Sequence, residues 1–323
     1  MKILVRLPNW LGDMVMAVGF MNQLEQYYPG ALVSVIAKKG IHQLLEYFPP
    51  IEHQFVFSKE EYPGIQGPYG FGKMIGRQEN FDLYFSLPDS LSTAITGFAT
   101  GAKKRVGYSK EMRQLLLTDS FTKPKGLHRV EEYVHLLESY TGRPHFPINV
   151  ALQHHYPKED YVVVNINSEA SSRRLTVAKA VELIDTLASH IQQGIVMIGA
   201  PKEKEFIDAV VSNLRVSFVE NLAGRTDLNE LIARLAGARV VLSTDSGPAH
   251  LANALGTKTV VLFGAGNENN TAPYNKSLLQ VIRLGQLSCE PCQKNVCVRF
   301  ETPQCLERLD SRLIAASIKT MLA

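Results

Sequence analysis

Residues 8–13 form the first of three short polar segments whose side chains could do chemistry. Gly12 and Asp13 lie there just before an apolar, helix-like run. The helix dipole favours a carboxylate in the first helical turn. Such a carboxylate either caps the helix or serves as a general base toward a bound substrate. For a lone aspartate, capping is the more common of the two roles, and both stay open for Asp13 from these residues alone.

The second segment runs from Asp245 to His250 and contains Ser246, Gly247 and Pro248. Proline suits the first turn of a helix, where its missing N–H group costs nothing. The N–H groups around such a helix start can bind an anion such as a pyrophosphate. An ordinary capped helix is the alternative, but the added carboxylate and imidazole favour a binding site.

The third segment, residues 165–174, gathers amides, hydroxyl groups and two guanidinium groups, among them Ser168 and Arg173. Guanidinium groups are suited to bidentate contact with phosphate, although a solvated polar loop would look the same. A transferase that cleaves a sugar–diphosphate bond must stabilise the leaving diphosphate, deprotonate an acceptor hydroxyl and hold both substrates together. The three segments can supply the groups for the first two tasks.

The first half of the chain alternates strand-like and helix-like runs, which predicts parallel βαβ units. Strand-like runs are residues 3–7, 31–37, 55–57, 83–87 and the region of 106, and helix-like runs are 13–28 and 41–48. A proline-containing break at residues 143–157 is typical of an interdomain linker.

The alternation then restarts. Strand-like runs are residues 161–166, 195–198, 216–219, 240–242 and 259–263, and helix-like runs are 177–190, 203–214, 228–235, 248–255 and 311–322. We therefore predict an α/β protein with two Rossmann-like doubly wound domains, residues 1–150 and 151–323, facing a central cleft. Ligands of such sheets bind beyond the carboxyl ends of the strands.

Charge balance, the length of apolar runs and a missing motif argue against several classes of function. The 323 residues include 34 basic and 31 acidic side chains, a balance that argues against nucleic acid as a partner. No apolar run approaches the roughly 20 residues of a membrane-spanning helix, and no secretory signal is present. We expect a cytoplasmic protein, with attachment to the membrane surface left open. The absence of a G-x-G-x-x-G motif argues against a nicotinamide enzyme.

All four cysteines fall in one window and are Cys289, Cys292, Cys297 and Cys305. The first two have the C-x-x-C spacing of a metal knuckle. Reduced thiols that pack a loop are an equal alternative, since disulfides are disfavoured in the cytoplasm. We assign no metal site, and whether these thiols bind a metal, pair or stay reduced is left open.

Taken in order, these segments resemble glycosyltransferase family 9, the bacterial lipopolysaccharide heptosyltransferases. The resemblance covers nearly the whole chain and is carried by residues 8–16, 104–108, 199–203, 222–226, 245–256, 263–264 and 289–292. It implies two Rossmann-like domains of the GT-B type, with the acceptor on the first and the nucleotide sugar on the second. The last helix is expected to pack back toward the first domain.

The resemblance also implies a reaction: inverting transfer of a sugar, heptose from ADP-heptose, to a lipopolysaccharide core acceptor. No metal or other cofactor is required. The expected partners are the nucleotide sugar and a lipid-linked saccharide, at the cytoplasmic face of the inner membrane. The oligomeric state stays open.

Site residues follow by match of motif. Asp13 resembles the catalytic base, Arg173 the basic residue at the diphosphate, and Glu203 an acid at the donor ribose. We expect donor contacts from Ser168, Arg173, Glu203, Asp245, Ser246, Gly247, Pro248 and His250. Lys103, Lys104 and Arg105 resemble a basic patch for a phosphorylated acceptor, with a solvated turn as the alternative.

The chain departs from the family pattern at two places. Residues 173–176 read Arg-Arg-Leu-Thr where the family often has Lys-Arg-Trp-Pro, and residues 165–167 read Asn-Ile-Asn in place of Asn-Pro-Gly. Both departures bear more on which nucleotide sugar is the donor than on the class of reaction. Two alternatives remain: a nucleotide-sugar epimerase of the same twin-domain plan, and a non-catalytic nucleotide-binding module.

Overall fold

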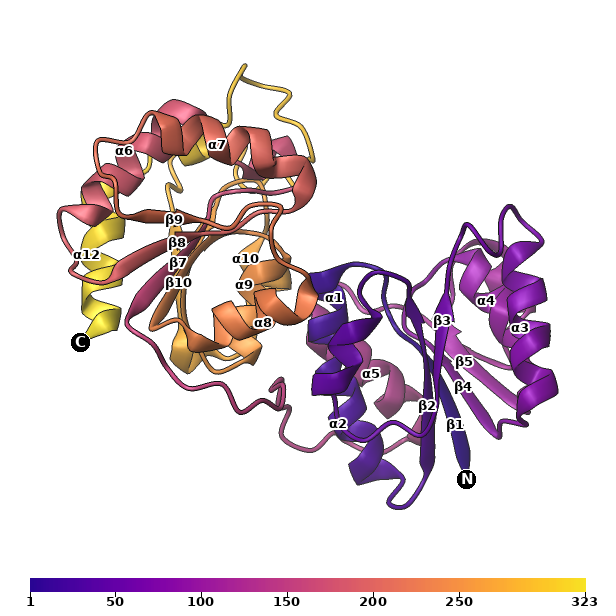
Figure 1. Cartoon of the computed structure of the whole chain (residues 1–323). Helices are drawn as coiled ribbons and strands as arrows, with labels where there is room; N and C mark the ends of the chain where they lie inside the picture. The colour runs from indigo at the N-terminus through magenta and orange to yellow at the C-terminus, as the bar shows by residue number, and fades with distance from the viewer. The chain divides into compact units, whose positions relative to one another are not determined.

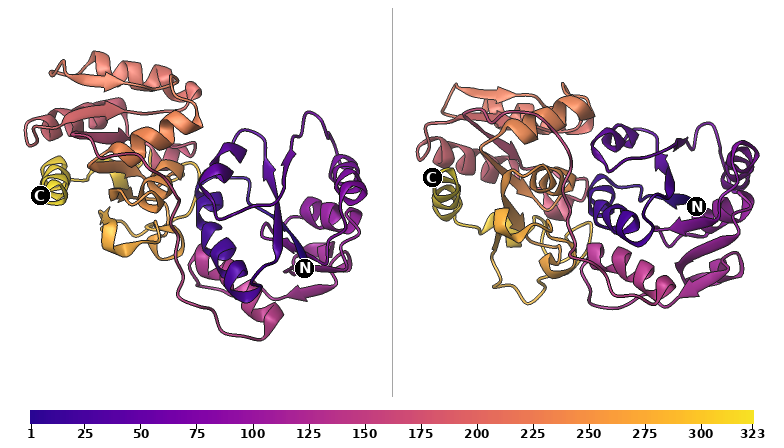
Figure 2. Two further views of the ribbon diagram at one scale, coloured as in Figure 1. Left: turned by 60° about the horizontal axis from the view of Figure 1, so that its bottom comes forward. Right: turned by 90° about the horizontal axis from the view of Figure 1, so that it is seen from below.

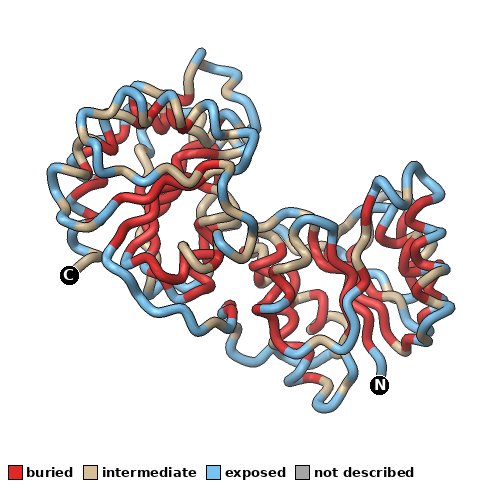
Figure 3. Tube along the Cα trace, viewed as in Figure 1, coloured by how far each residue is buried: buried red, intermediate tan, exposed pale blue. Residues whose placement is uncertain are grey.

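The structure is a computed structural model that describes residues 1–323, apart from the side chain of Glu111. The chain forms two compact units, Met1–Gln153 and His154–Ala323. Each unit contains one six-stranded parallel sheet covered by helices on both faces (Figure 1). The central strands of both sheets are almost completely buried (Figure 3).

The N-terminal sheet has the strand order β3-β2-β1-β4-β5-β6. Its strands are β1 (Lys2–Arg6), β2 (Leu32–Lys38), β3 (Gln54–Phe57), β4 (Leu83–Ser86), β5 (Lys104–Tyr108) and β6 (Asp119–Phe121). All neighbours pair in parallel, and Arg6 at the end of β1 lies between Ile36 and Ser86. The order reverses between β1 and β4, the position at which doubly wound sheets bind ligands.

Helices cover both faces of this sheet (Figures 1 and 2). One face carries α1 (Leu11–Met16), α2 (Val18–Tyr27) and α5 (Arg129–Thr141), and the other carries α3 (Gly67–Gln78) and α4 (Leu91–Ala99). The single helix predicted over residues 13–28 is two helices that meet at Ala17. The helix predicted over 41–48 is the 3-10 helix η1 (His42–Tyr47), and a second 3-10 helix, η2 (Glu111–Leu115), follows β5.

Sequence patterning missed α3, because glycine has a low intrinsic helix propensity. Packing explains why this glycine-rich segment is nevertheless helical. Phe71 and Ile75 are buried against the sheet, while Gly72 and Gly76 face α4. A Cβ atom at either glycine would lie 2.4 Å from a carbonyl oxygen of α4 or of Thr100, which follows it. The glycines therefore let the two helices approach closely.

The C-terminal sheet has the strand order β12-β11-β10-β7-β8-β9, again all parallel and reversing between β7 and β10. Its strands are β7 (Tyr161–Asn165), β8 (Gly194–Met197), β9 (Val219–Asn221), β10 (Val240–Thr244), β11 (Lys258–Phe263) and β12 (Leu279–Arg283). The strand predicted at residues 216–219 is observed as β9, which begins at Val219, the last residue of the predicted range.

Figure 1 shows α6 (Val177–Ala188), α7 (Lys204–Ser212) and α12 (Ser311–Leu322) on one face of this sheet, and α8 (Leu228–Gly237) and α9 (Gly247–Ala254) on the other. Shorter helical elements are α10 (Glu268–Thr271), α11 (Gln304–Glu307), η3 (Ser171–Arg173), η4 (Pro201–Glu203) and η5 (Lys276–Leu278).

The final helix α12 packs on α6 and on β10 and β11. Its side chains Ile314, Ala315 and Ile318 are buried in the core of the C-terminal unit. We expected this helix to pack toward the first domain. Its apolar face packs within its own unit, and the expected contact with the first domain stays a prediction. Among the described residues, no helix combines the length and the apolar character needed to cross a bilayer.

The close approach of α3 and α4 yields a stability prediction. Gly72→Ala should lower the free energy of unfolding by about 1–3 kcal/mol, the usual cost of overpacking, because the new methyl group meets backbone. The control is Gly70→Ala in the same helix, where a Cβ atom finds nothing closer than a Tyr62 ring carbon at 3.9 Å. That variant should be neutral or up to about 1 kcal/mol more stable. Urea denaturation followed by circular dichroism measures both, and equal effects would contradict the packing argument.

Candidate active site

Asp13 lies at the carboxyl edge of the N-terminal sheet, in the first turn of α1. Trp10 occupies the N-cap position of that helix, and its side chain makes no cap hydrogen bond. Asp13 is therefore inside the helix and is not its cap residue, so the capping alternative does not hold. The carboxylate is 30% exposed and can receive a proton from a bound molecule.

Arg6 holds the loop in front of α1. Its buried guanidinium donates from Nη1 to the carbonyl oxygens of Leu7 (2.6 Å) and Ile36 (3.2 Å), and from Nη2 to Oδ1 of Asn9 (2.5 Å). Burial lowers the pKa of Arg6 to about 10, which still leaves it charged at neutral pH. These three hydrogen bonds fasten the backbone that positions Asp13.

Burial raises the pKa of Asp13 above its ordinary value. The positive charges of Arg129 and Lys123 oppose that rise, and the carboxylate of Glu132 adds to it. Nε of Arg129 lies 3.8 Å from Oδ1 of Asp13. A carboxylate whose pKa is moved toward the working pH accepts a proton more readily as a general base. The environment of Asp13 thus fits that role.

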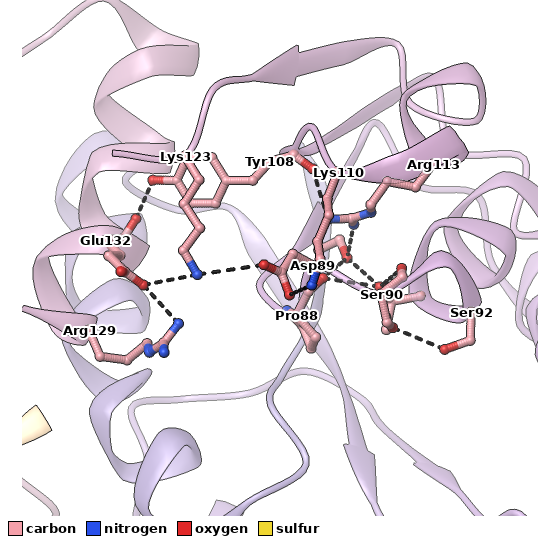
Figure 4. Close-up of polar contacts among 12 residues, drawn as sticks. Pro88, Asp89, Ser90, Ser92, Tyr108, Lys110, Arg113, Lys123, Arg129 and Glu132 are labelled. Carbon is pink, nitrogen blue, oxygen red and sulfur yellow. Dashed lines mark hydrogen bonds and ion pairs between the residues drawn. The ribbon is translucent and has the colours of Figure 1, made fainter. Parts of the chain in front are cut away.

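Five further charged side chains form an ion-pair network at this edge (Figure 4). We call Asp89, Lys110, Lys123, Arg129 and Glu132 the edge network. Asp89 lies 3.9 Å from Lys110 and 3.6 Å from Lys123, and Glu132 lies 3.1 Å from Lys123 and 2.8 Å from Arg129. The first three follow β4, β5 and β6, whose carboxyl ends share one edge, and the last two begin α5.

Sequence reasoning missed the edge network, although a signal was available: three of its members come within three residues of a strand end. A second buried guanidinium braces these strand ends. Arg113 donates from Nη1 to the carbonyl oxygen of Tyr108 (2.9 Å) and from Nη2 to Oγ of Ser86 (2.7 Å). Burial lowers the pKa of Arg113.

The predicted acceptor residues lie at the opposite, amino-terminal edge of the sheet. Lys103 and Lys104 stand at the start of β5 and pair with Asp82 (2.7 Å) and Asp119 (3.5 Å). Arg105 donates to two backbone carbonyl groups. At about 3.3 Å per residue, the length of β5 separates them by roughly 13 Å from the edge that carries the predicted base. The structure does not bring this patch beside the base.

In the C-terminal unit, the start of α9 has the features of an anion site. Ser246 is the N-cap residue but its side chain caps no N–H group of the first turn. Its hydroxyl donates to the carbonyl oxygen of Thr244 (3.1 Å) and accepts from Nδ2 of Asn165 (2.8 Å). Gly247 and Pro248 open the helix. Pro248 has no N–H group and that of Ala249 donates to the carbonyl oxygen of Ser246 (3.1 Å), so the N–H group of Gly247 is the one at this helix start that could bind an anion.

Arg173 and Asp245 meet beside this helix start. Nη1 of Arg173 lies 3.1 Å from Oδ2 of Asp245, whose side chain is only 4% exposed. Burial raises the pKa of Asp245, while Arg173 and Arg283 oppose the rise. Nε of Arg173 is buried without a hydrogen-bond partner, whereas Oδ2 of Asp245 has the ion pair with Nη1 but no hydrogen bond of good geometry. Unsatisfied buried polar atoms call for an explanation, and a polar ligand at this position supplies one.

The remaining predicted donor residues share this edge. Ser168 is half-buried in the loop after β7, and His250 is buried in the first turn of α9. Glu203 follows β8, where its carboxylate accepts a hydrogen bond from the N–H group of Ala200 (2.8 Å). The structure thus gathers the predicted donor residues on the loops that follow β7, β8 and β10.

All four cysteines are free thiols that line one pocket of the C-terminal unit. Burial raises the pKa of Cys305 to about 11. In the part of the chain that the structure describes, no set of three or more His, Cys, Asp or Glu side chains is arranged to hold a metal ion.

Comparison with known proteins now adds to this geometry. The family model described as glycosyltransferase family 9 (heptosyltransferase) matches residues 71–301. The chain belongs to glycosyltransferase family 9. It is therefore an enzyme that transfers a sugar, and the comparison favours this function over the epimerase and the non-catalytic module.

Relatives and solved structures agree with the family match. Lipopolysaccharide heptosyltransferase 2 of Escherichia coli (strain K12) is 27% identical over 319 residues, which cover 88% of each chain. The structure of E. coli ADP-heptose lps heptosyltransferase II has a TM-score of 0.84 at 23% identity and covers 100% of this chain and 98% of that one. E. coli heptosyltransferase WaaC with ADP has a TM-score of 0.78 at 17% identity, with 99% and 100% covered. The predicted α/β class, two Rossmann-like sheets of the GT-B type, is confirmed.

The buried carboxylate of this glycosyltransferase yields a pH-dependent stability prediction. Because the pKa of Asp245 in the folded state is raised above 3.8, folding is favoured while this group is protonated, and that contribution is lost as the pH rises through the raised pKa. Asp245→Asn removes the charge at nearly constant shape. It should raise Tm at pH 7.5, and the gain should shrink as the pH falls toward 3.8.

Asp208→Asn is the matched control, since hydrogen bonding from Lys204 lowers the pKa of the exposed Asp208. That variant should shift Tm in the opposite direction at pH 7.5. Differential scanning fluorimetry across pH measures both variants. A lower Tm for Asp245→Asn at pH 7.5 would show that the carboxylate stabilises the fold.

Proposed function

We propose that this glycosyltransferase transfers heptose from ADP-heptose to a lipopolysaccharide core acceptor, with inversion at the anomeric carbon. The names of its relatives support this choice: one acts on lipopolysaccharide as a heptosyltransferase, and the titles of two solved structures name ADP-heptose and ADP. The observation that carries the proposal is Asp13, a half-buried carboxylate with a raised pKa at the ligand-binding edge of its sheet.

The C-terminal unit holds the donor in this proposal. The diphosphate binds the N–H groups at the start of α9, around Ser246 and Gly247, and the guanidinium of Arg173 contacts its oxygens. These donors act on the charge that develops as the sugar–diphosphate bond breaks. Asp245 holds Arg173 beside the helix start. Glu203, on the loop after β8, binds the ribose.

The N-terminal unit supplies the base. The acceptor hydroxyl attacks the anomeric carbon while its proton passes to the carboxylate of Asp13. A new C–O bond forms, the bond to the diphosphate breaks, and ADP leaves with the bonding electron pair. A single displacement of this kind inverts the configuration. Transfer requires that the donor sugar and Asp13 reach the same acceptor in the catalytic complex.

No metal or other cofactor is needed in this scheme, because Arg173 and backbone N–H groups provide the positive charge for the diphosphate. The acceptor is lipid-linked, so we place the reaction at the cytoplasmic face of the inner membrane, with the enzyme bound peripherally. Because the scheme needs no metal ion, transfer should persist in EDTA.

Replacing the base tests the reaction. Asp13→Asn should lower kcat by about 10²- to 10⁴-fold, the range of general-base catalysis, and leave ADP affinity unchanged, since we place ADP on the other unit. The assay incubates the enzyme with a panel of nucleotide sugars and truncated lipopolysaccharide and follows nucleotide release. ADP affinity is measured by titration calorimetry.

Two outcomes would contradict the proposal. Turnover of the nucleotide sugar without acceptor would point to an epimerase or a hydrolase. Loss of ADP affinity in Asp13→Asn would place this carboxylate at the donor and not at the acceptor hydroxyl. Asp208→Asn, an exposed carboxylate on α7, is the control and should transfer normally.

Removing one guanidinium tests the diphosphate site. Arg173→Ala should weaken ADP binding by about tenfold to a hundredfold, because a hydrogen bond to a charged group contributes about 1.5–3 kcal/mol and 1.4 kcal/mol is tenfold. Arg174→Ala is the matched control, since that neighbour lies over the ring of Phe206, 5.3 Å from its centroid. Calorimetry that finds the same ADP affinity in Arg173→Ala and wild type removes Arg173 from the site.

A further inference from the structure

Arg129 is a charged residue in a place that helix stability does not explain. It is the first residue of α5, and a cation at a helix N-terminus is disfavoured by the dipole. The start of this helix is nevertheless stabilised by capping hydrogen bonds. Nδ1 of His128 accepts a hydrogen bond from the N–H group of Val130 (3.2 Å), and Oε2 of Glu131 accepts one from the N–H group of His128 (3.1 Å). This capping box fixes the backbone from which Arg129 projects.

Glu132 holds the Arg129 side chain. Nη1 of Arg129 donates to Oε2 of Glu132 at 2.8 Å, and the Glu132 side chain is only 13% exposed. The same carboxylate oxygen lies 3.1 Å from Nζ of Lys123. With its outer nitrogen engaged there, Arg129 turns Nε toward Asp13, 3.8 Å from Oδ1. Figure 4 shows Arg129 and Lys123 converging on Glu132.

We propose that Arg129, held by Glu132, is a positioning residue for Asp13 that orients the carboxylate and keeps it ionised before the acceptor binds. This inference rests on the proposed role of Asp13 as the base. Arg129 touches no substrate in this scheme and acts through Asp13.

The charged and titratable groups that face Asp13 come from two elements. Helix α5 contributes Arg129, Glu132 and Tyr133, and the segment after β6 contributes Lys123. Burial holds the pKa of Tyr133 well above its ordinary value, so this phenol stays neutral across the working range. Asp89 contacts Lys123 from the loop after β4. Two cations thus stabilise the ionised Asp13, and the Glu132 carboxylate opposes them.

This arrangement predicts shifts of opposite sign from two neighbouring variants. Arg129→Met removes a stabilising cation, so the pKa of Asp13 should rise by roughly one unit, the lower end for an opposite charge at this distance. Glu132→Gln removes the opposing negative charge, while its amide oxygen still accepts from Arg129, so the pKa of Asp13 should fall. Loss of packing alone would not produce opposite signs. Arg129→Lys should restore most of the wild-type value.

The experiment has two readouts on the full chain. Carbon-13 NMR of enzyme labelled at the aspartate carboxyl carbons follows the titration of Asp13, assigned by its absence in Asp13→Asn. The acid limb of the pH profile of kcat/KM reports the same group during transfer. Arg215→Met, an exposed arginine on the other unit, is the control and should leave both readouts unchanged.

Opposite shifts in Arg129→Met and Glu132→Gln, with recovery in Arg129→Lys, support the inference. An unmoved titration of Asp13 in Arg129→Met, or shifts of the same sign in both variants, overturns it. The NMR readout does not depend on catalysis. If wild-type enzyme transfers no heptose while the carboxyl titrations shift as expected, the proposed function fails and the coupling of Arg129 to Asp13 stands.

Discussion

The structure depends on one constraint: strands that run in parallel present all their carboxyl ends at one edge of the sheet. Both units obey it with the same reversal of strand order beside their first strand. In the N-terminal unit this edge collects Asp13, Asp89, Lys110 and Lys123 from four different connections. Residues far apart in the sequence thus come within ion-pair distance without any local signal that links them. The proposed chemistry of this enzyme depends on that edge.

The helix start of the proposed donor site could be predicted from the sequence because its signals are local. The sequence Ser246-Gly247-Pro248 predicts a helix start within three residues. In the structure α9 begins at Gly247, with Ser246 as its N-cap residue. Helix α3 shows the opposite case. Its glycines weaken the intrinsic preference for a helix, and it is stabilised by Phe71 and Ile75 packing on the sheet. Such tertiary contacts leave no periodic pattern strong enough to recognise.

The basic residues illustrate why a cationic run in the sequence does not by itself indicate a ligand-binding edge. Lys103 and Lys104 form the most visible cationic run near a strand, but Lys103 directly precedes β5 and Lys104 opens it, so both lie at its amino-terminal end. The cations at the other edge, Lys110 and Lys123, are single residues in loops. The direction of a parallel strand, and not the density of charge, decides which edge a basic residue reaches. The partnership of Arg129 with Asp13 could not be seen at all, because it joins two distant helix starts.

The ion pair between Arg173 and Asp245 has a consequence for turnover. A guanidinium that already has a carboxylate partner gives up that contact, in whole or in part, when a diphosphate binds, and regains it when the diphosphate departs. In the proposed donor site, the resident carboxylate therefore competes with ADP for the same cation. Such competition weakens the hold on the spent nucleotide after the sugar has moved, and so favours its escape. Asp245 is only 4% exposed, and the missing side chain at Gly266, where a Cβ atom would lie 2.0 Å from Oδ2, leaves room for this competitor beside Arg173.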